Sequence, residues 1–129
     1  MNGLSQYRKY QTETAAPEDQ IVLLYEGAQR FIERAATAME AGDYGDVSLN
    51  VGKAQRIFAE LSSCLNYDAG EIAVNLARLY EYWSWRLSQA LIKKDVEALR
   101  EVSQTVGDMA GAWAEAARQV RVQRARGHG

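Results

Sequence analysis

The side chains that most often carry out catalysis are scarce in this 129-residue sequence. It contains one histidine, His128, next to the last residue, and one cysteine, Cys64. A Ser-His-Asp or Cys-His arrangement needs a histidine that the fold can hold beside the nucleophile, which a histidine at the end of a polar, arginine-rich stretch does not provide. The di-iron sites of helical bundles also need histidines, in Glu-x-x-His pairs that project into the core. We therefore expect no enzymatic activity, no metal and no cofactor.

The other potentially reactive groups have structural explanations. Cys64 falls on the apolar face of a predicted helix, away from any helix N-terminus or pair of basic residues, so we expect a small buried side chain and not a reactive thiol. Acidic residues fall on polar faces or at helix ends, where solvation and the helix dipole stabilise them. These residues are Glu60, Glu71, Glu81, Glu97 and Glu101. What the sequence has in excess is apolar and aromatic helix surface, which indicates a binding protein.

Four aromatic side chains crowd six residues of one predicted helix: Tyr80, Tyr82, Trp83 and Trp85. At about 100° per residue they cannot all face the same core. Tyr80 and Trp83 continue the core stripe of this helix, so Tyr82 and Trp85 are expected to face outward. Outward-facing aromatic residues commonly mark a protein-binding surface, whereas packing on a neighbouring helix is the alternative.

The clearest amphipathic helix is predicted over residues 17–39. Its apolar residues recur at steps of three and four and form one stripe that needs partners. Pro17 suits the first helical position, and Gly42 can adopt the left-handed conformation that ends a helix. The stripe consists of Ile21, Leu24, Tyr25, Ala28, Phe31, Ile32, Ala35, Ala36 and Met39.

Three further helices are predicted from the same spacing. Asp46 is expected to cap the second, the third runs from about Glu71 to Lys93, and Asp95 is expected to cap the fourth, whose apolar stripe ends by Val122. Short connections make neighbouring helices antiparallel, so the sequence predicts an all-α, antiparallel up-down-up-down four-helix bundle with an N-terminal arm. Two glycines inside the fourth helix indicate a close approach of a neighbouring backbone or local pliability. These glycines are Gly107 and Gly111. The apolar stripe of the second helix consists of Val47, Val51, Ala54, Phe58, Leu61 and Leu65. The apolar stripe of the third helix consists of Ile72, Leu76, Leu79, Tyr80, Trp83, Leu87, Ala90 and Leu91.

The bundle is expected over residues 17–117, between an arm at 1–16 and a basic extension at 118–129. Within the arm, Tyr7 and Tyr10 can pack on the body of the protein or on a partner. The extension carries four arginines and no acidic residue. We expect it to be solvated and frayed, with binding of phosphate or of an acidic partner as the alternative.

Composition places the chain among soluble globular proteins, with 47% hydrophobic and 25% charged residues. No apolar run approaches the roughly 18 residues that span a bilayer, and residues 1–10 lack the apolar core of a signal peptide. The lone cysteine agrees with a reducing compartment. We therefore expect a cytoplasmic (cytosolic) protein without membrane insertion.

Short motifs along most of the chain resemble those of the flagellin-specific export chaperones, the FliS family. No single motif is diagnostic, but their order and spacing together are. The motifs are Thr14-Ala15-Ala16-Pro17-Glu18, Leu23-Leu24-Tyr25-Glu26-Gly27-Ala28, Arg30-Phe31-Ile32, Lys53-Ala54-Gln55 with Ile57, Glu60-Leu61, Leu65-Asn66, Gly70-Glu71-Ile72-Ala73, Asn75-Leu76, Leu79-Tyr80-Glu81-Tyr82, Arg86-Leu87, Lys93-Lys94-Asp95, Glu101-Val102 and Ala112-Trp113.

The resemblance implies a small cytoplasmic chaperone that binds the C-terminal helical segment of flagellin, prevents premature polymerisation and delivers flagellin to the flagellar type III secretion apparatus. It also implies export-gate components as further partners, and an arm whose tyrosine, Tyr7 or its substitute Tyr10, covers an apolar groove that flagellin uses. The chain departs from the family pattern at Ala16, which cannot cap a helix, and at Trp83 and Trp85, which indicate a surface adapted to one flagellin. The predicted flagellin-binding residues are Tyr7, Tyr10, Leu24, Ile57, Leu61, Leu76, Tyr80, Tyr82 and Trp85.

Two other functions compete with the chaperone. One is a homo-oligomeric structural or adaptor bundle, which would bury the same aromatic side chains against itself or against another amphipathic helix. The other, which we do not expect, is nucleic-acid binding through the arginines of residues 118–129.

Overall fold

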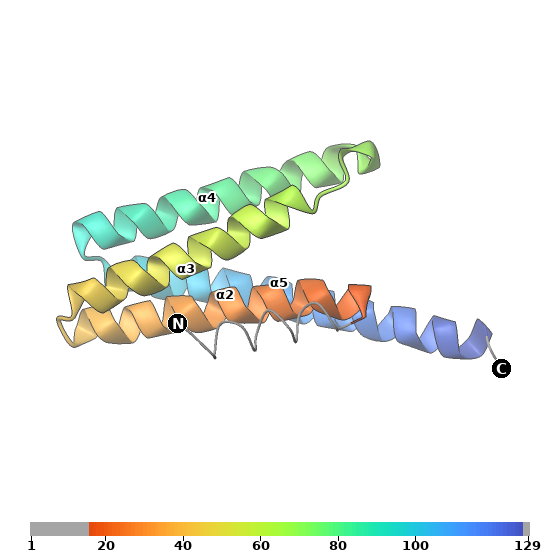
Figure 1. Cartoon of the computed structure of the whole chain (residues 1–129), viewed down its shortest axis with the longest axis horizontal. Coiled ribbons are helices and arrows are strands. Elements are labelled where there is room, and N and C mark those ends of the chain that lie inside the picture. Colours follow the sequence, from red (N-terminus) through yellow and green to blue (C-terminus); the bar gives the residue numbers. More distant parts are fainter. Residues whose placement is uncertain (1–15, 128–129) are drawn as a thin grey trace.

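The computed structural model describes residues 16–127, which form four long α-helices and one short 3-10 turn (Figure 1). Successive helices run antiparallel, and α5 packs against both α2 and α4, which closes the bundle. This confirms the predicted all-α, up-down-up-down four-helix bundle. Tyr7 and Tyr10 lie outside the described residues. The elements are α2 (Pro17–Glu40), α3 (Tyr44–Ser63), η1 (Tyr67–Ala69), α4 (Glu71–Lys93) and α5 (Val96–Gly127).

Helix α2 begins and ends at the residues that its sequence indicates. Pro17 occupies the first turn together with Glu18 and Asp19, while Ala16 contributes no side-chain cap. Gly42 has a φ of 76°, so it adopts the left-handed conformation that a glycine accepts most easily. Most of the predicted stripe is buried, and Ile21, Leu24 and Phe31 are partly buried at its edges.

The starts of α3 and α5 are fixed by aspartates. Asp43 Oδ1 accepts a hydrogen bond from the backbone N–H of Asp46 at 3.1 Å, so α3 is capped by Asp43 and the predicted cap at Asp46 is wrong. Both residues are good caps, and the reversal at Gly42 is tight enough for the helix to restart at the first of them. The predicted cap of α5 is confirmed, because Asp95 Oδ1 accepts from the N–H of Ala98 at 3.1 Å.

Aromatic side chains fill the centre of the bundle. Tyr25 of α2, Phe58 of α3, and Tyr80 and Trp83 of α4 are buried, with ring centroids 5.3 to 6.4 Å apart. The hydroxyls of Tyr25 and Tyr80 form a buried hydrogen bond of 2.7 Å. Burial raises the pKa of both phenols above the ordinary value. Trp113 of α5 lies beside Tyr25, so all four helices contribute to this cluster.

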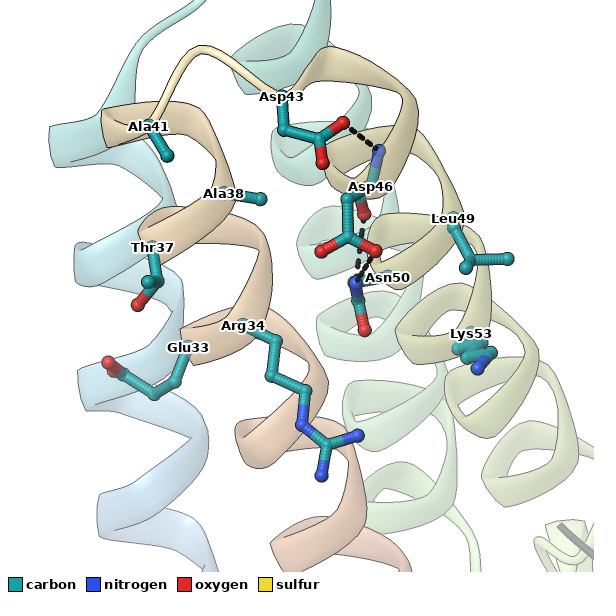
Figure 2. Close-up of a pocket in the computed structure, with 10 residues that line it drawn as sticks. All are labelled: Glu33, Arg34, Thr37, Ala38, Ala41, Asp43, Asp46, Leu49, Asn50 and Lys53. Carbon is teal, nitrogen blue, oxygen red and sulfur yellow. Dashed lines mark hydrogen bonds between the residues drawn. The ribbon is translucent and has the colours of Figure 1, made fainter. Parts of the chain in front are cut away.

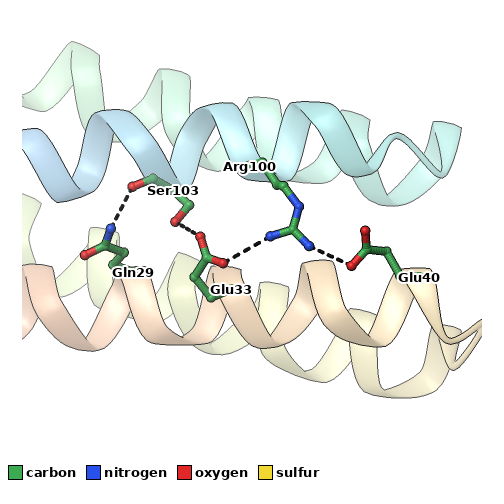
Figure 3. Close-up of polar contacts among 5 residues, drawn as sticks. All are labelled: Gln29, Glu33, Glu40, Arg100 and Ser103. Atoms are coloured by element: carbon green, nitrogen blue, oxygen red, sulfur yellow. Dashed lines mark hydrogen bonds and ion pairs between the residues drawn. The ribbon is translucent and has the colours of Figure 1, made fainter.

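A polar seam joins α2 to α5 along the side of the bundle (Figure 3). The Arg100 guanidinium pairs with Glu33 at 3.2 Å and with Glu40 at 2.6 Å. The hydroxyl of the buried Ser103 donates to Glu33, and Gln29 Nε2 donates to the Ser103 carbonyl at 3.2 Å. This seam fixes the register of the two helices, because each contact joins residues 60 to 74 positions apart.

The seam also explains one of the two glycines in α5. A Cβ on Gly107 would clash with Gln29 Nε2, so the glycine makes room for a side chain of α2. The sequence predicted a neighbouring backbone or local pliability instead. Nothing lies within 4 Å of a Cβ built on Gly111, and nothing in the structure explains that glycine.

Two side chains and one segment differ from the predictions. Cys64 is exposed, because it follows the last residue of α3 and caps its end, where no neighbouring helix covers it. Ile72 is 65% exposed, because the first turn of α4 lies at the end of the bundle. Residues 118–127 are not frayed but continue α5. Arg121 pairs with Asp19 at 2.5 Å, and Arg124 pairs with Glu18 at 2.8 Å.

Candidate partner-binding surface

The predicted binding residues that the structure describes lie at three depths. Leu61 and Tyr80 are buried in the core. Leu24, Ile57 and Leu76 are partly buried and pack against it. Tyr82 and Trp85 are exposed on the outer side of α4.

The exposed pair shares one side of α4 with two further exposed apolar side chains. Tyr82 and Trp85 are 51% and 56% exposed, and their ring centroids lie 6.2 Å apart, so the two rings already pack on each other. Val74 is 39% exposed and Ile92 is 72% exposed. On a helical wheel these four residues fall within an arc of about 80°, opposite the core stripe. We call them the α4 outer face.

Sequence reasoning missed Val74 and Ile92 as members of this face. Their spacing from Tyr82 and Trp85 is a helical one, so a second apolar stripe on α4 could have been found in the sequence. The first stripe concealed it, because a helix with apolar residues on two sides has no clean amphipathic pattern. α4 thus has one side for the core and another that no described residue of the chain covers fully.

An ion pair beside the α4 outer face joins α4 to α5. Arg86, which lies between that face and α5, donates to Glu101 of α5 at 2.9 Å. This hydrogen bond holds the pKa of Arg86 above its ordinary value. Because the pair is partly exposed, it orients α4 more than it stabilises the fold.

The partly buried residues lie towards one end of the bundle, where α2 and α4 begin and α3 ends. Leu24, Ile57 and Leu76 come from these three helices. A Cβ on Gly27 would lie 3.4 Å from Ile57 Cδ1, so this glycine lets Ile57 pack close to the backbone of α2. All three pack against the core cluster that includes the buried Leu61 and Tyr80, and we call them the apolar rim.

These surfaces suit recognition by packing. Within residues 16–127 no group of His, Cys, Asp or Glu side chains could hold a metal ion. Among the same residues no helix is long and apolar enough to cross a membrane. What the geometry offers is aromatic and aliphatic side chains at helical spacing, which is the arrangement that binds an amphipathic helix.

Comparison with known proteins identifies the family. The model of the family described as "Flagellar protein FliS" matches residues 1–120. The chain belongs to the FliS family. The flagellar secretion chaperone FliS of Bacillus subtilis is 36% identical over 123 residues, which cover 95% of this chain and 92% of that protein. The flagellar secretion chaperone FliS of Salmonella typhimurium is 31% identical over 131 residues, and the match covers 97% of this chain and 97% of that protein.

A solved structure has the same fold as this FliS-family protein. It is described as a "Crystal structure of flagellar chaperone from bacteria", and it matches with a TM-score of 0.73 over 92% of this chain and 99% of the other. The two sequences are 19% identical, so this likeness bears on the fold.

Proposed function

We propose that this FliS-family protein is a flagellar secretion chaperone whose client is flagellin. The observation that carries the proposal is the family match over residues 1–120, together with relatives that are named flagellar secretion chaperones and span nearly the whole chain. The protein acts in the cytosol, where it binds the C-terminal helical segment of flagellin, prevents premature polymerisation and delivers the client to the flagellar type III apparatus.

We propose two contact regions for the client. One amphipathic client helix packs on the α4 outer face, where Tyr82 and Trp85 act as aromatic anchors. Another packs on the apolar rim of Leu24, Ile57 and Leu76, with Tyr7 and Tyr10 of the arm at residues 1–16 as further proposed contacts. Leu61 and Tyr80 are buried in the core cluster against which the rim residues pack. The remaining proposed units are the bundle at 17–117 and the basic extension at 118–129.

The chaperone works by mass action. A protein that binds the polymerising helices of flagellin lowers the concentration of free, polymerisation-competent monomer. The complex must still dissociate at the export gate, whose components are further partners, so the affinity is tight but not extreme. No bond is made or broken, and the binding free energy comes from burial of apolar and aromatic side chains on both partners.

Sedimentation of the full chain with and without a flagellin C-terminal peptide tests this function. We expect a chaperone that sediments as a one-to-one complex with the peptide. The exposed α4 outer face also fits a homo-oligomeric bundle, which would sediment as a stable oligomer and ignore the peptide. That result would contradict the chaperone.

A further inference from the structure

The apolar side chains of the α4 outer face are arranged almost symmetrically about the middle of the helix. Tyr82 and Trp85 lie near the centre, while Val74 lies about two turns before Tyr82 and Ile92 about two turns after Trp85. All four side chains are exposed, from 39% for Val74 to 72% for Ile92. Trp83 is the midpoint between Val74 and Ile92, and the midpoint of the two exposed rings falls within one residue of it.

Opposite charges occupy the two ends of the same face. Glu71 lies in the first turn of α4 and Lys93 in the last. On a helical wheel Glu71 falls inside the arc of the α4 outer face, and Lys93 falls about 20° beyond its edge. Both side chains are exposed, and within residues 16–127 neither forms an ion pair. Their midpoint lies within one residue of Trp83, so the charges share the centre of the apolar side chains.

We propose that in the free protein the α4 outer face packs against the same face of a second copy of this chain. A twofold axis that crosses α4 near Trp83 runs the two helices antiparallel, and such an interface is self-complementary. Val74 then lies opposite Ile92 of the partner subunit, and the reverse contact forms at the other end. The rings of Tyr82 and Trp85 meet their symmetry mates close to the axis, where aromatic side chains bury the most apolar surface.

Charge selects the antiparallel direction. A parallel pair would place the two copies of Glu71 side by side at one end and the two copies of Lys93 at the other, and like charges repel. In the antiparallel pair each Glu71 lies opposite Lys93 of the partner subunit. Exposed ion pairs add little affinity, so these two contacts set direction and register while the apolar side chains supply the binding free energy. Arg78, the other charged residue inside the arc, falls within about one turn of Trp85 of the partner subunit, where a guanidinium can lie over the indole ring.

The size of the face makes this dimer weak. Four apolar side chains per copy form an interface at the small end of specific interfaces, so we expect a Kd of roughly 1–100 µM. The pairing of the free protein does not depend on what the client is. One consequence does rest on the proposed function: a client helix that uses the same side chains excludes the second copy, so the chaperone becomes monomeric when it is loaded.

An isolated exposed leucine elsewhere in the bundle provides a matched control. Leu49, which is 52% exposed, borders an open cleft of about 570 Å³ between α2 and α3 (Figure 2). No other large apolar side chain lines this cleft, and its charges are of both signs. A change at Leu49 therefore alters an exposed apolar side chain outside the α4 outer face. The charged residues that line the cleft are Glu33, Arg34, Asp43, Asp46 and Lys53.

Sedimentation velocity of the full chain alone, between about 1 and 200 µM, tests the pairing. We expect the sedimentation coefficient to rise with concentration from monomer towards dimer and to fall again on dilution. Trp85→Glu puts two carboxylates near the axis and should raise the Kd about tenfold or more, whereas Leu49→Glu should change it less than about twofold. A chain that stays monomeric throughout, or equal effects of the two variants, would overturn the proposal. Because no client is present, that failure would leave the proposed function standing.

A charge exchange tests the antiparallel direction. Lys93→Glu places two carboxylates together at each end of the pair and should raise the Kd about threefold or more, whereas Arg126→Glu, with the same change in net charge on α5, should not. The double variant Glu71→Lys, Lys93→Glu restores an opposite-charge contact at both ends, so its Kd should return to within about twofold of the unaltered protein. Both changes oppose the dipole of α4, so circular dichroism must first show that the variants fold. A folded double variant that dimerises no better than Lys93→Glu would contradict the antiparallel pair.

Discussion

At the scale of single residues, position on the helical wheel decides what each aromatic side chain does. Trp83 and Trp85 are two residues apart in the same helix, yet Trp83 is buried among Tyr25, Phe58 and Tyr80 while Trp85 is more than half exposed. The sequence alone predicts this difference, because it follows from the helical repeat. The same indole group therefore stabilises the core at one position and is available to a partner at the other.

Alanine substitution measures that difference. Trp83→Ala removes a large buried side chain and leaves a cavity, so we expect a loss of about 3–5 kcal/mol in the free energy of unfolding. Trp85→Ala, its matched control in the same helix, should change that free energy by less than about 1 kcal/mol. Urea unfolding followed by circular dichroism checks both values. Similar losses in the two variants would show that Trp85 also belongs to the core.

The buried hydroxyl pair gives a second prediction. Tyr25→Phe leaves the Tyr80 hydroxyl buried without the 2.7 Å hydrogen bond, which should cost about 1–3 kcal/mol. The double variant Tyr25→Phe, Tyr80→Phe removes both polar groups and should lose less than the sum of the two single variants. Urea unfolding of all four proteins measures this coupling. Strictly additive losses would mean that the two hydroxyls do not depend on each other.

The same pair makes stability fall at alkaline pH. Burial raises the pKa of both phenols in the folded state, so above about pH 10 the unfolded chain loses these protons first. The free energy of unfolding should then fall by up to about 1.4 kcal/mol per pH unit for each phenol. Other groups also titrate there, so the comparison is with the double phenylalanine variant, which should lose less stability between pH 9 and about 11. Parallel pH profiles of the two proteins would refute this account.

At the scale of elements, the sequence predicts where a helix begins or ends only if no second capping residue lies nearby. Pro17 and Gly42 have no nearby competitor, and α2 begins and ends where they indicate. Asp43 and Asp46 compete for the start of α3, and the sequence does not say which of two good caps is used. Cys64 shows another limit, because its wheel position is apolar but its exposure depends on where the neighbouring helices end.

Contacts between distant residues are the part that the sequence could not predict. The seam of Glu33, Arg100 and Ser103 depends on the rotation and register of α2 against α5, which no local pattern encodes. For the same reason the sequence recognised Gly107 as unusual but not that Gln29 fills the space beside it. The pairing of Arg121 and Arg124 with the first turn of α2 was invisible in the same way.

Substitution of the two glycines of α5 tests whether the contact between Gly107 and Gln29 matters for stability. Gly111→Ala adds a methyl group in open space, so it should gain about 1 kcal/mol in the free energy of unfolding from helix propensity alone. Gly107→Ala has the same propensity but displaces the Gln29 amide from the Ser103 carbonyl, so we expect the gain to be cancelled. Thermal unfolding of both variants compares them. A Gly107→Ala protein as stable as Gly111→Ala would show that Gln29 moves aside without cost.

At the scale of the whole molecule, the bundle separates stability from recognition. The core is sealed by aromatic side chains from all four helices, so residues on the outer surfaces can vary without unfolding the protein. The α4 outer face is such a surface, because its exposed aromatic and aliphatic side chains lie opposite the core stripe of the same helix.

Alanine substitutions on the α4 outer face should weaken client binding more than they lower stability. Tyr82→Ala and Trp85→Ala remove side chains that are about half exposed, so each should weaken binding of the flagellin C-terminal peptide by about 1–2 kcal/mol or more while changing stability less. Calorimetric titration gives the affinity, and thermal melts of the same proteins give the stability. Tyr67→Ala is the matched control, because Tyr67 is similarly exposed but belongs to η1 and not to α4. If the α4 variants bind as tightly as the control, the client does not use this face, and the apolar rim of Leu24, Ile57 and Leu76 becomes the place to look.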